Sequence, residues 1–100
     1  MATTPKALAR TAAATSSTTL YTVPSSTTAI ITNIAVCNNT STAGTFTILL
    51  DDIELHKDTA IAANSTAYID LKQVLATTKT IKGLASATTI DFHISGVEIS

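Results

Sequence analysis

The sequence contains no tryptophan and few aromatic residues of any kind, namely two tyrosines and two phenylalanines. A core built from it must therefore be filled by Ile, Val, Leu and Ala, because few large rings are available. The one cysteine, Cys37, has no partner for an internal disulfide, so the fold must stand without covalent cross-links. Because Cys37 lies in a strongly apolar segment, we expect a buried and unreactive thiol.

Charge is also scarce. Charged residues make up 13% of the chain, about half of the usual share, and the net charge is −1. No basic stripe is present, so nucleic acid is not an expected partner. No apolar run approaches the ~20 residues that span a bilayer, and the polar N-terminus lacks a secretory signal, so we expect no membrane partner. The shortage of charge indicates a surface that is partly covered by other subunits, and the alternative is a Thr-rich surface that faces solvent.

What the chain does have is threonine, 21 residues of it, and a high content of β-branched side chains, which favour strands. The segment 27–38 runs for twelve residues without Gly, Pro or charge. Read at a period of two, both of its faces are largely apolar, with Ile30 and Ile34 on one and Ile31 and Ala35 on the other. This pattern predicts a strand that is central in its sheet, covered on both sides, or both.

The remaining apolar runs predict short strands separated by turn residues. Runs 45–50 and 53–57 are joined by Asp51 and Asp52 and read as a hairpin, with Ile53 pointing inward. Segment 58–65 is expected to be a loop that carries Ile61. In the last strand the apolar positions change phase at Gly96, which predicts a β-bulge there. The other expected strands are 18–23, 66–71, 78–84 and 88–100.

Seven or eight short strands with no helix predict an all-β protein, a single antiparallel β-sandwich of jelly-roll-like topology. We assign residues 18–100 to this sandwich domain and residues 1–17 to an extended N-terminal arm. The arm has one large apolar residue, Leu8, so we expect it to be ordered only against a neighbouring subunit. Its predicted partner-contact residues are Lys6, Leu8 and Arg10. The first fifty residues carry +2 and the rest −3, so the acidic half of an adjacent subunit, or a shell, is expected to receive the two cations.

No motif for catalysis is apparent. The acidic cluster 51–56 has two interpretations, a cation site that uses Glu54 and His56, or a solvated hairpin tip. We favour the tip, because the spacing matches no known metal loop. Since no Ser or Cys lies in a nucleophile motif, we expect no enzymatic activity, and we predict neither a metal nor a cofactor.

Three stretches resemble a known group of proteins. They are Leu20-Tyr21-Thr22-Val23-Pro24, the pattern Ile-x-x-Ile-x-Val-x-Asn within residues 27–40, and Ser95-Gly96-Val97-Glu98 near the end. Together with Ala62-Ala63-Asn64, they make residues 18–100 similar to small β-sandwich virion proteins of tailed bacteriophages, several of which are capsid decoration (cement) proteins.

The resemblance implies a structural protein that is made in the host cytoplasm and carried on the capsid exterior. Its implied partners are the major capsid protein and further copies of itself, most simply in a homotrimer. The alternative it leaves open is a tail, neck, baseplate or fibre component, acting as an adaptor or as a receptor- or glycan-binding module. Tyr21 and Tyr68 are the candidate sugar contacts for that alternative.

Overall fold

The protein is a sandwich of two antiparallel four-stranded sheets, and its structure, a computed structural model, describes residues 2–100. Most of these residues lie in strands, and no residue from 2 to 100 is helical. The strands are β1 (Thr3–Ala12), β2 (Thr18–Thr22), β3 (Thr28–Asn38), β4 (Gly44–Leu50), β5 (Ile53–Ile61), β6 (Thr66–Leu75), β7 (Thr80–Ala85) and β8 (Ile90–Ile99). The predicted all-β class is confirmed.

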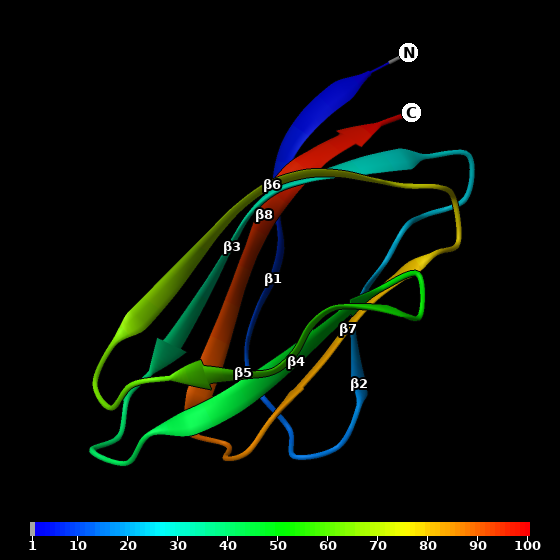
Figure 1. The fold of residues 1–100 in the computed structure, drawn as a ribbon. Helices are drawn as coiled ribbons and strands as arrows, with labels where there is room; N and C mark the ends of the chain where they lie inside the picture. The colour runs from blue at the N-terminus through cyan, green and yellow to red at the C-terminus, as the bar shows by residue number, and fades with distance from the viewer. Residues whose placement is uncertain (1) are drawn as a thin grey trace.

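The topology is that of a jelly roll. One sheet has the order β1-β8-β3-β6 and the other has the order β2-β7-β4-β5. The chain turns back on itself between β4 and β5, and its two halves then pair as β1 with β8, β2 with β7, β3 with β6 and β4 with β5. Rolling up such a long hairpin gives two facing sheets, as Figure 1 shows.

The hairpin at the centre of this arrangement is confirmed. Asp51 and Asp52 have φ angles of 55° and 61°, which are the left-handed values that a two-residue turn requires at both positions. Aspartate tolerates this region better than most residues, so the turn forms without glycine. The expectation for Ile53 is wrong, since its side chain is 71% exposed at the start of β5.

β3 is an inner strand of its sheet, as predicted, but its apolar residues do not cover two faces. Four of them are fully buried toward the opposite sheet: Ala29, Ile31, Ile34 and Val36. The register against β8 shifts just after Ile31, which marks a β-bulge at Thr32. The bulge changes the phase of the alternation, so a strand that is wet on one face reads in the sequence as apolar on both. Cys37 consequently lies on the outer face and is half-buried, which corrects the prediction of a buried thiol.

The bulge predicted at Gly96 lies instead in the strands on either side of β8. The register skips Leu8 on β1 and Thr32 on β3, both beside Ser95. β8 itself keeps its alternation through Gly96 and stays in one sheet, so it contains no bulge at this residue. Gly96 is needed for another reason, because a Cβ there would lie 2.3 Å from the carbonyl oxygen of Ile30.

The structure corrects the expectation of an N-terminal arm that lacks a partner in its own chain. Residues 3–12 form β1, which pairs along its whole length with β8 (Figure 1). Leu8 is buried in the core, since the bulge at this residue turns its side chain inward. The main-chain hydrogen bonds of a ladder do not depend on apolar side chains, so a Thr- and Ala-rich segment can join a sheet edge. Likewise, β5 extends through the predicted loop to Ile61, which is buried.

Candidate functional site

The clearest surface feature is one end of the sandwich, formed by four loops that lie far apart in the sequence. They are residues 13–17, 39–43, 62–65 and 86–89, and they connect successive strands at the lower end of Figure 1. Every residue in them is Ala, Ser, Thr or Asn. We call these four loops the uncharged end. The opposite end carries both termini and the Asp51-Asp52 turn.

Main-chain hydrogen bonds tie the loops of the uncharged end to one another. The amide of Asn39 donates to the carbonyl of Thr89 at 3.1 Å, and the amide of Asn64 donates to the carbonyl of Thr40 at 2.9 Å. The first loop is held by the amide of Ala85, which donates to the carbonyl of Ala14. The four loops therefore form one connected surface rather than four independent ones.

Asn38 anchors this surface from inside. Its side chain is 1% exposed at the end of β3. The Nδ2 atom donates to the carbonyls of Thr42 at 2.9 Å and Ala62 at 3.3 Å, and the Oδ1 atom accepts from the amide of Thr40. A buried amide with three partners fixes the loops it bonds. The sequence showed Asn38 only as a residue before a loop, because its partners lie up to 24 positions away.

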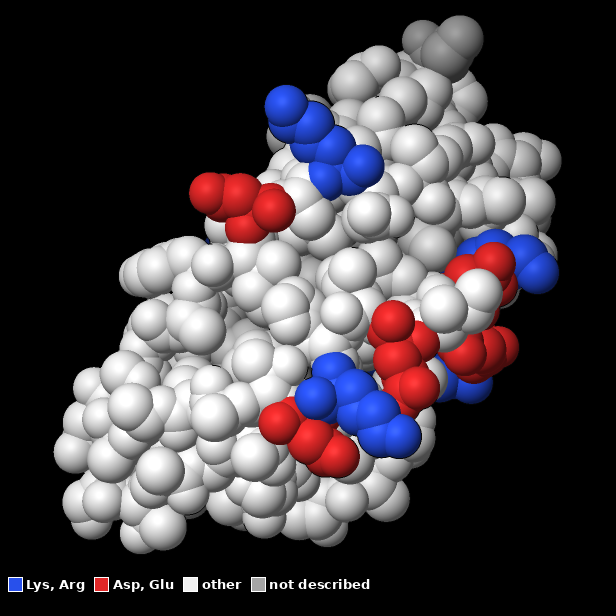
Figure 2. Space-filling view, in the orientation of Figure 1, with Lys and Arg blue, Asp and Glu red and all other residues white. Residues whose placement is uncertain are grey.

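The uncharged end is suited to a broad, dry contact. Figure 2 shows Lys, Arg, Asp and Glu over the upper part, the middle and the right of the visible face, while the lower left, where loops 39–43 and 62–65 lie, carries none. Asp91, two residues after loop 86–89, lies beside this surface and accepts a hydrogen bond from Asn39 at 2.9 Å. A surface of short uncharged side chains loses little side-chain entropy and no charge hydration when it is covered.

The three predicted contact residues of the N-terminal segment do not form one site. Lys6 lies 3.4 Å from Glu98, so an acid of the second half of the same chain receives it. Leu8 belongs to the core. Arg10 is exposed on the outer face of its sheet, opposite His93 in the register. Arg10 is the one whose side chain remains fully available to a partner.

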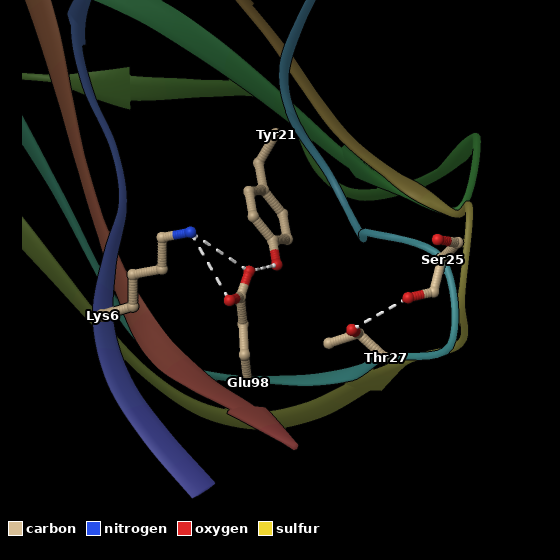
Figure 3. Close-up of polar contacts among 5 residues, drawn as sticks. All are labelled: Lys6, Tyr21, Ser25, Thr27 and Glu98. Carbon is tan, nitrogen blue, oxygen red and sulfur yellow. Dashed lines mark hydrogen bonds and ion pairs between the residues drawn. The ribbon is translucent and has the colours of Figure 1, made fainter. Parts of the chain in front are cut away.

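Lys6, Tyr21 and Glu98 form a polar cluster that joins the two sheets (Figure 3). The Tyr21 hydroxyl on β2 donates to the Glu98 carboxylate on β8 at 2.5 Å. This hydrogen bond holds the pKa of Glu98 below its usual range, and the charge of Lys6 adds to the effect. Burial, reinforced by Glu98, raises the pKa of the Tyr21 hydroxyl above its ordinary value. These contacts connect the two sheets at this end of the sandwich.

The acidic cluster at the hairpin is occupied by ion pairs. Asp52 accepts from Lys82 at 2.7 Å, and Asp51 lies 3.7 Å from Lys79. Glu54 pairs with Lys57 three residues along β5. Within residues 2–100 no group of three His, Cys, Asp or Glu side chains is arranged to hold a metal ion. The geometry here fits the solvated hairpin tip rather than a cation site.

Three hollows lie on the surface of the described residues. One is lined by Thr45, Phe46, Thr47 and Asp58 beside Ser86, another lies between β1 and β2, and the third is lined by Thr32, Asp70, Leu71 and Lys72. Tyr21 is buried, so of the two candidate sugar contacts Tyr68 alone is exposed, at 74%. Within residues 2–100 the structure has no helix that could cross a membrane.

No protein-family model, curated protein or solved structure matches this chain.

Proposed function

We propose that this protein is a structural virion protein of a tailed bacteriophage, a capsid decoration protein that binds the outer capsid lattice and stabilises it. Its partner is the major capsid protein, and its place is the capsid exterior. The observation that carries the proposal is the uncharged end, a connected surface of small side chains on a chain that is poor in charge throughout. The resemblance of residues 18–100 to virion proteins supplies the kind of partner.

The shape of the molecule supports binding through this end. The sandwich measures 45 by 21 by 18 Å, and its strands run along the long axis (Figure 1). A contact at the uncharged end would leave the charged hairpin tip and the sides of both sheets facing away from the shell. Repeated many times on a lattice, a modest contact of this kind adds up to a large stabilisation of the shell.

Charged substitutions in the exposed loops test this function. Ser41→Glu and Thr88→Glu place a carboxylate on the uncharged end, and the matched control Ser25→Glu places one in the exposed turn at the other end. Each protein is sedimented with shells that are assembled from the major capsid protein alone. We expect the first two variants to lose binding and Ser25→Glu to bind like the wild type. Equal binding by all three variants would contradict the use of this end.

The second candidate function, a tail or fibre component that binds a glycan, is favoured by one observation. Tyr68 is exposed on the outer face of its sheet, two residues from Asp70, which accepts a hydrogen bond from Asn33 at 3.4 Å. An exposed ring beside polar groups is a common sugar contact. Binding to host surface glycans that is lost in Tyr68→Ala would favour this function. The homotrimer implied by the resemblance stays a prediction, which the mass of the free protein tests.

A further inference from the structure

β6 is the outer strand of its sheet and has a neighbour, β3, on one side only among the described residues. From Thr66 to Lys72 its side chains alternate between a partly buried inner face and an exposed outer face, and Gln73 interrupts this alternation because it is exposed as well. The outer row is exposed at every position and consists of Thr66, Tyr68, Asp70, Lys72 and Val74. An edge strand with exposed apolar side chains is a natural template for pairing with another strand.

The order of these residues is self-complementary about Leu71. Asp70 and Lys72 flank Leu71 directly and carry opposite charges. Tyr68 and Val74 lie three residues before and three residues after Leu71. We propose that two copies of this chain pair through β6, antiparallel, about a two-fold axis at Leu71. Asp70 of each copy then faces Lys72 of the other, and Tyr68 of each copy faces Val74 of the other.

The charges select this register over its neighbours. In an antiparallel two-fold pair, the register can shift only in steps that keep each side chain on its own face. One step in one direction places Asp70 opposite Asp70 of the second copy, and one step in the other places Lys72 opposite Lys72. Like charges directly opposite each other destabilise a strand pair, and opposite charges stabilise it.

The main chain of β6 is oriented for this pairing. The carbonyl of Ser65 accepts from the amide of Asn38 on β3. Along a strand, the direction of the main-chain groups alternates together with the face of the side chain. From Ser65 to Asp70 the core-facing residues of β6 therefore bond to β3, and the outer-face residues present their amides and carbonyls to the free edge. At Leu71 and Lys72 the register against β3 shifts, opposite the bulge at Thr32, so these two residues lack regular partners on β3. The outer-face residues are the ones that the register centred on Leu71 brings opposite one another.

The pairing also covers the apolar surface that this side of the sandwich leaves exposed. Tyr68 and Val74, at 74% and 65%, are two of the three large apolar side chains that are exposed in the structure, and both lie on β6. Ile69 and Leu71 on its inner face are only partly buried. The opposite edge of the same sheet is β1. It is less suited to strand addition, because it contains Pro5, which cannot donate a main-chain hydrogen bond.

Pairing through β6 would join the β1-β8-β3-β6 sheet of one copy to the same sheet of the second copy. The result is one continuous eight-stranded sheet, and the interface is isologous because both copies use the same surface. Because the two β6 strands are antiparallel, the uncharged ends of the two copies point in opposite directions. One shell can then contact only one copy of the pair. The pairing is a property of the free protein, so it is tested without shells and its failure leaves the proposed function untouched.

Charge exchange tests the register. The mass of the reduced, free protein is measured by sedimentation equilibrium up to about 1 mM, a range that detects weak association. We expect the wild type to approach twice its 10.3 kDa mass. Asp70→Lys and Lys72→Asp should each be monomeric, and the double variant should pair again, because both attractive contacts are restored with reversed polarity. A wild type that stays monomeric or forms a trimer overturns the proposal, as does pairing that the single variants leave unchanged.

A cross-link at the axis tests the geometry independently. Leu71 faces Leu71 of the second copy as a pair without mutual main-chain hydrogen bonds, where Cα atoms lie about 4.5 Å apart and a disulfide can form. In a Cys37→Ser background, Leu71→Cys should oxidise to a covalent dimer. Val74→Cys, which is more exposed but six residues from its counterpart in register, should not. Cross-linking of Val74→Cys as fast as Leu71→Cys overturns the proposed register, and circular dichroism checks that each variant is folded.

Discussion

The Tyr21 hydroxyl donates a hydrogen bond to the Glu98 carboxylate across the two sheets of the sandwich, at 2.5 Å. Glu98 points inward because β8 keeps its alternation through Gly96, and its side chain is only 14% exposed. Lys6 approaches the same carboxylate from β1, 3.4 Å away. One acid thus connects the first, second and last strands at the end of the molecule where both termini lie.

Removing the Tyr21 hydroxyl should weaken this connection. In Tyr21→Phe the ring still packs, but the Glu98 carboxylate loses its inter-sheet donor, so we expect the thermal midpoint to fall by several degrees. Tyr68→Phe is the matched control, because its hydroxyl belongs to an exposed ring, and its midpoint should not move. Differential scanning calorimetry at neutral pH measures both midpoints. Equal midpoints for the two variants would show that the Tyr21 hydroxyl does not stabilise the contact between the sheets.

The same contact makes stability depend on acid. The pKa of Glu98 is lower in the folded protein than in the unfolded chain, so the contact favours folding above the unfolded pKa of about 4.3. That contribution is lost as the pH falls through the lower folded pKa. We expect Glu98→Gln to be less stable than the wild type at pH 7 and to approach it in acid, as measured by urea unfolding at a series of pH values. A stability difference that does not change with pH would contradict this.

Gly96 should tolerate no larger residue. A Cβ at this position would lie 2.3 Å from the Ile30 carbonyl oxygen, which is main chain and cannot rotate away. We expect Gly96→Ala to lower the free energy of unfolding by about 3 kcal/mol. The control is Gly44→Ala, where the closest atom is the Ser86 hydroxyl oxygen at 2.7 Å on a side chain that can turn. Chemical unfolding should show the smaller loss for Gly44→Ala.

Asn38 should matter for the uncharged end as well as for stability. Asn38→Ala removes three hydrogen bonds from a fully buried position and leaves a cavity in place of the amide, which should reduce the free energy of unfolding by about 2 kcal/mol. Amide hydrogen exchange should rise in loops 39–43 and 62–65 more than elsewhere. Asn39→Ala, with an exposed side chain, is the control, and similar exchange in the two variants would show that Asn38 does not hold the loops.

Side-chain alternation predicted the sandwich because most strands are wet on one face. The hairpin was predicted because two apolar runs are joined by a short polar pair, and the left-handed angles of the two aspartates explain why the turn forms without glycine. The bulge at Thr32 was not predictable, since an extra residue in a ladder changes the phase without any residue that marks it. β1 was missed because its pairing relies on main-chain hydrogen bonds, which leave little trace in a segment of Thr and Ala.

The uncharged end escaped sequence analysis because its loops are separated by up to several strands. Loops 13–17 and 86–89 are neighbours only once β1 is known to pair with β8. A signal was nevertheless present. In a chain of antiparallel strands every second loop lies at the same end, and here every second loop lacks charge. The inward orientation of Glu98 carried no such signal, because the predicted bulge at Gly96 placed it on the outer face.

The copy number of this protein in purified virions tests the central proposal most directly. Quantitative mass spectrometry of intact particles, with the major capsid protein as the internal reference, gives the ratio of the two chains. A decoration protein predicts a copy number comparable to that of the major capsid protein, and its release should make the shells less resistant to heat. Absence from the particles, or only the few copies expected of a tail or fibre component, would contradict the account.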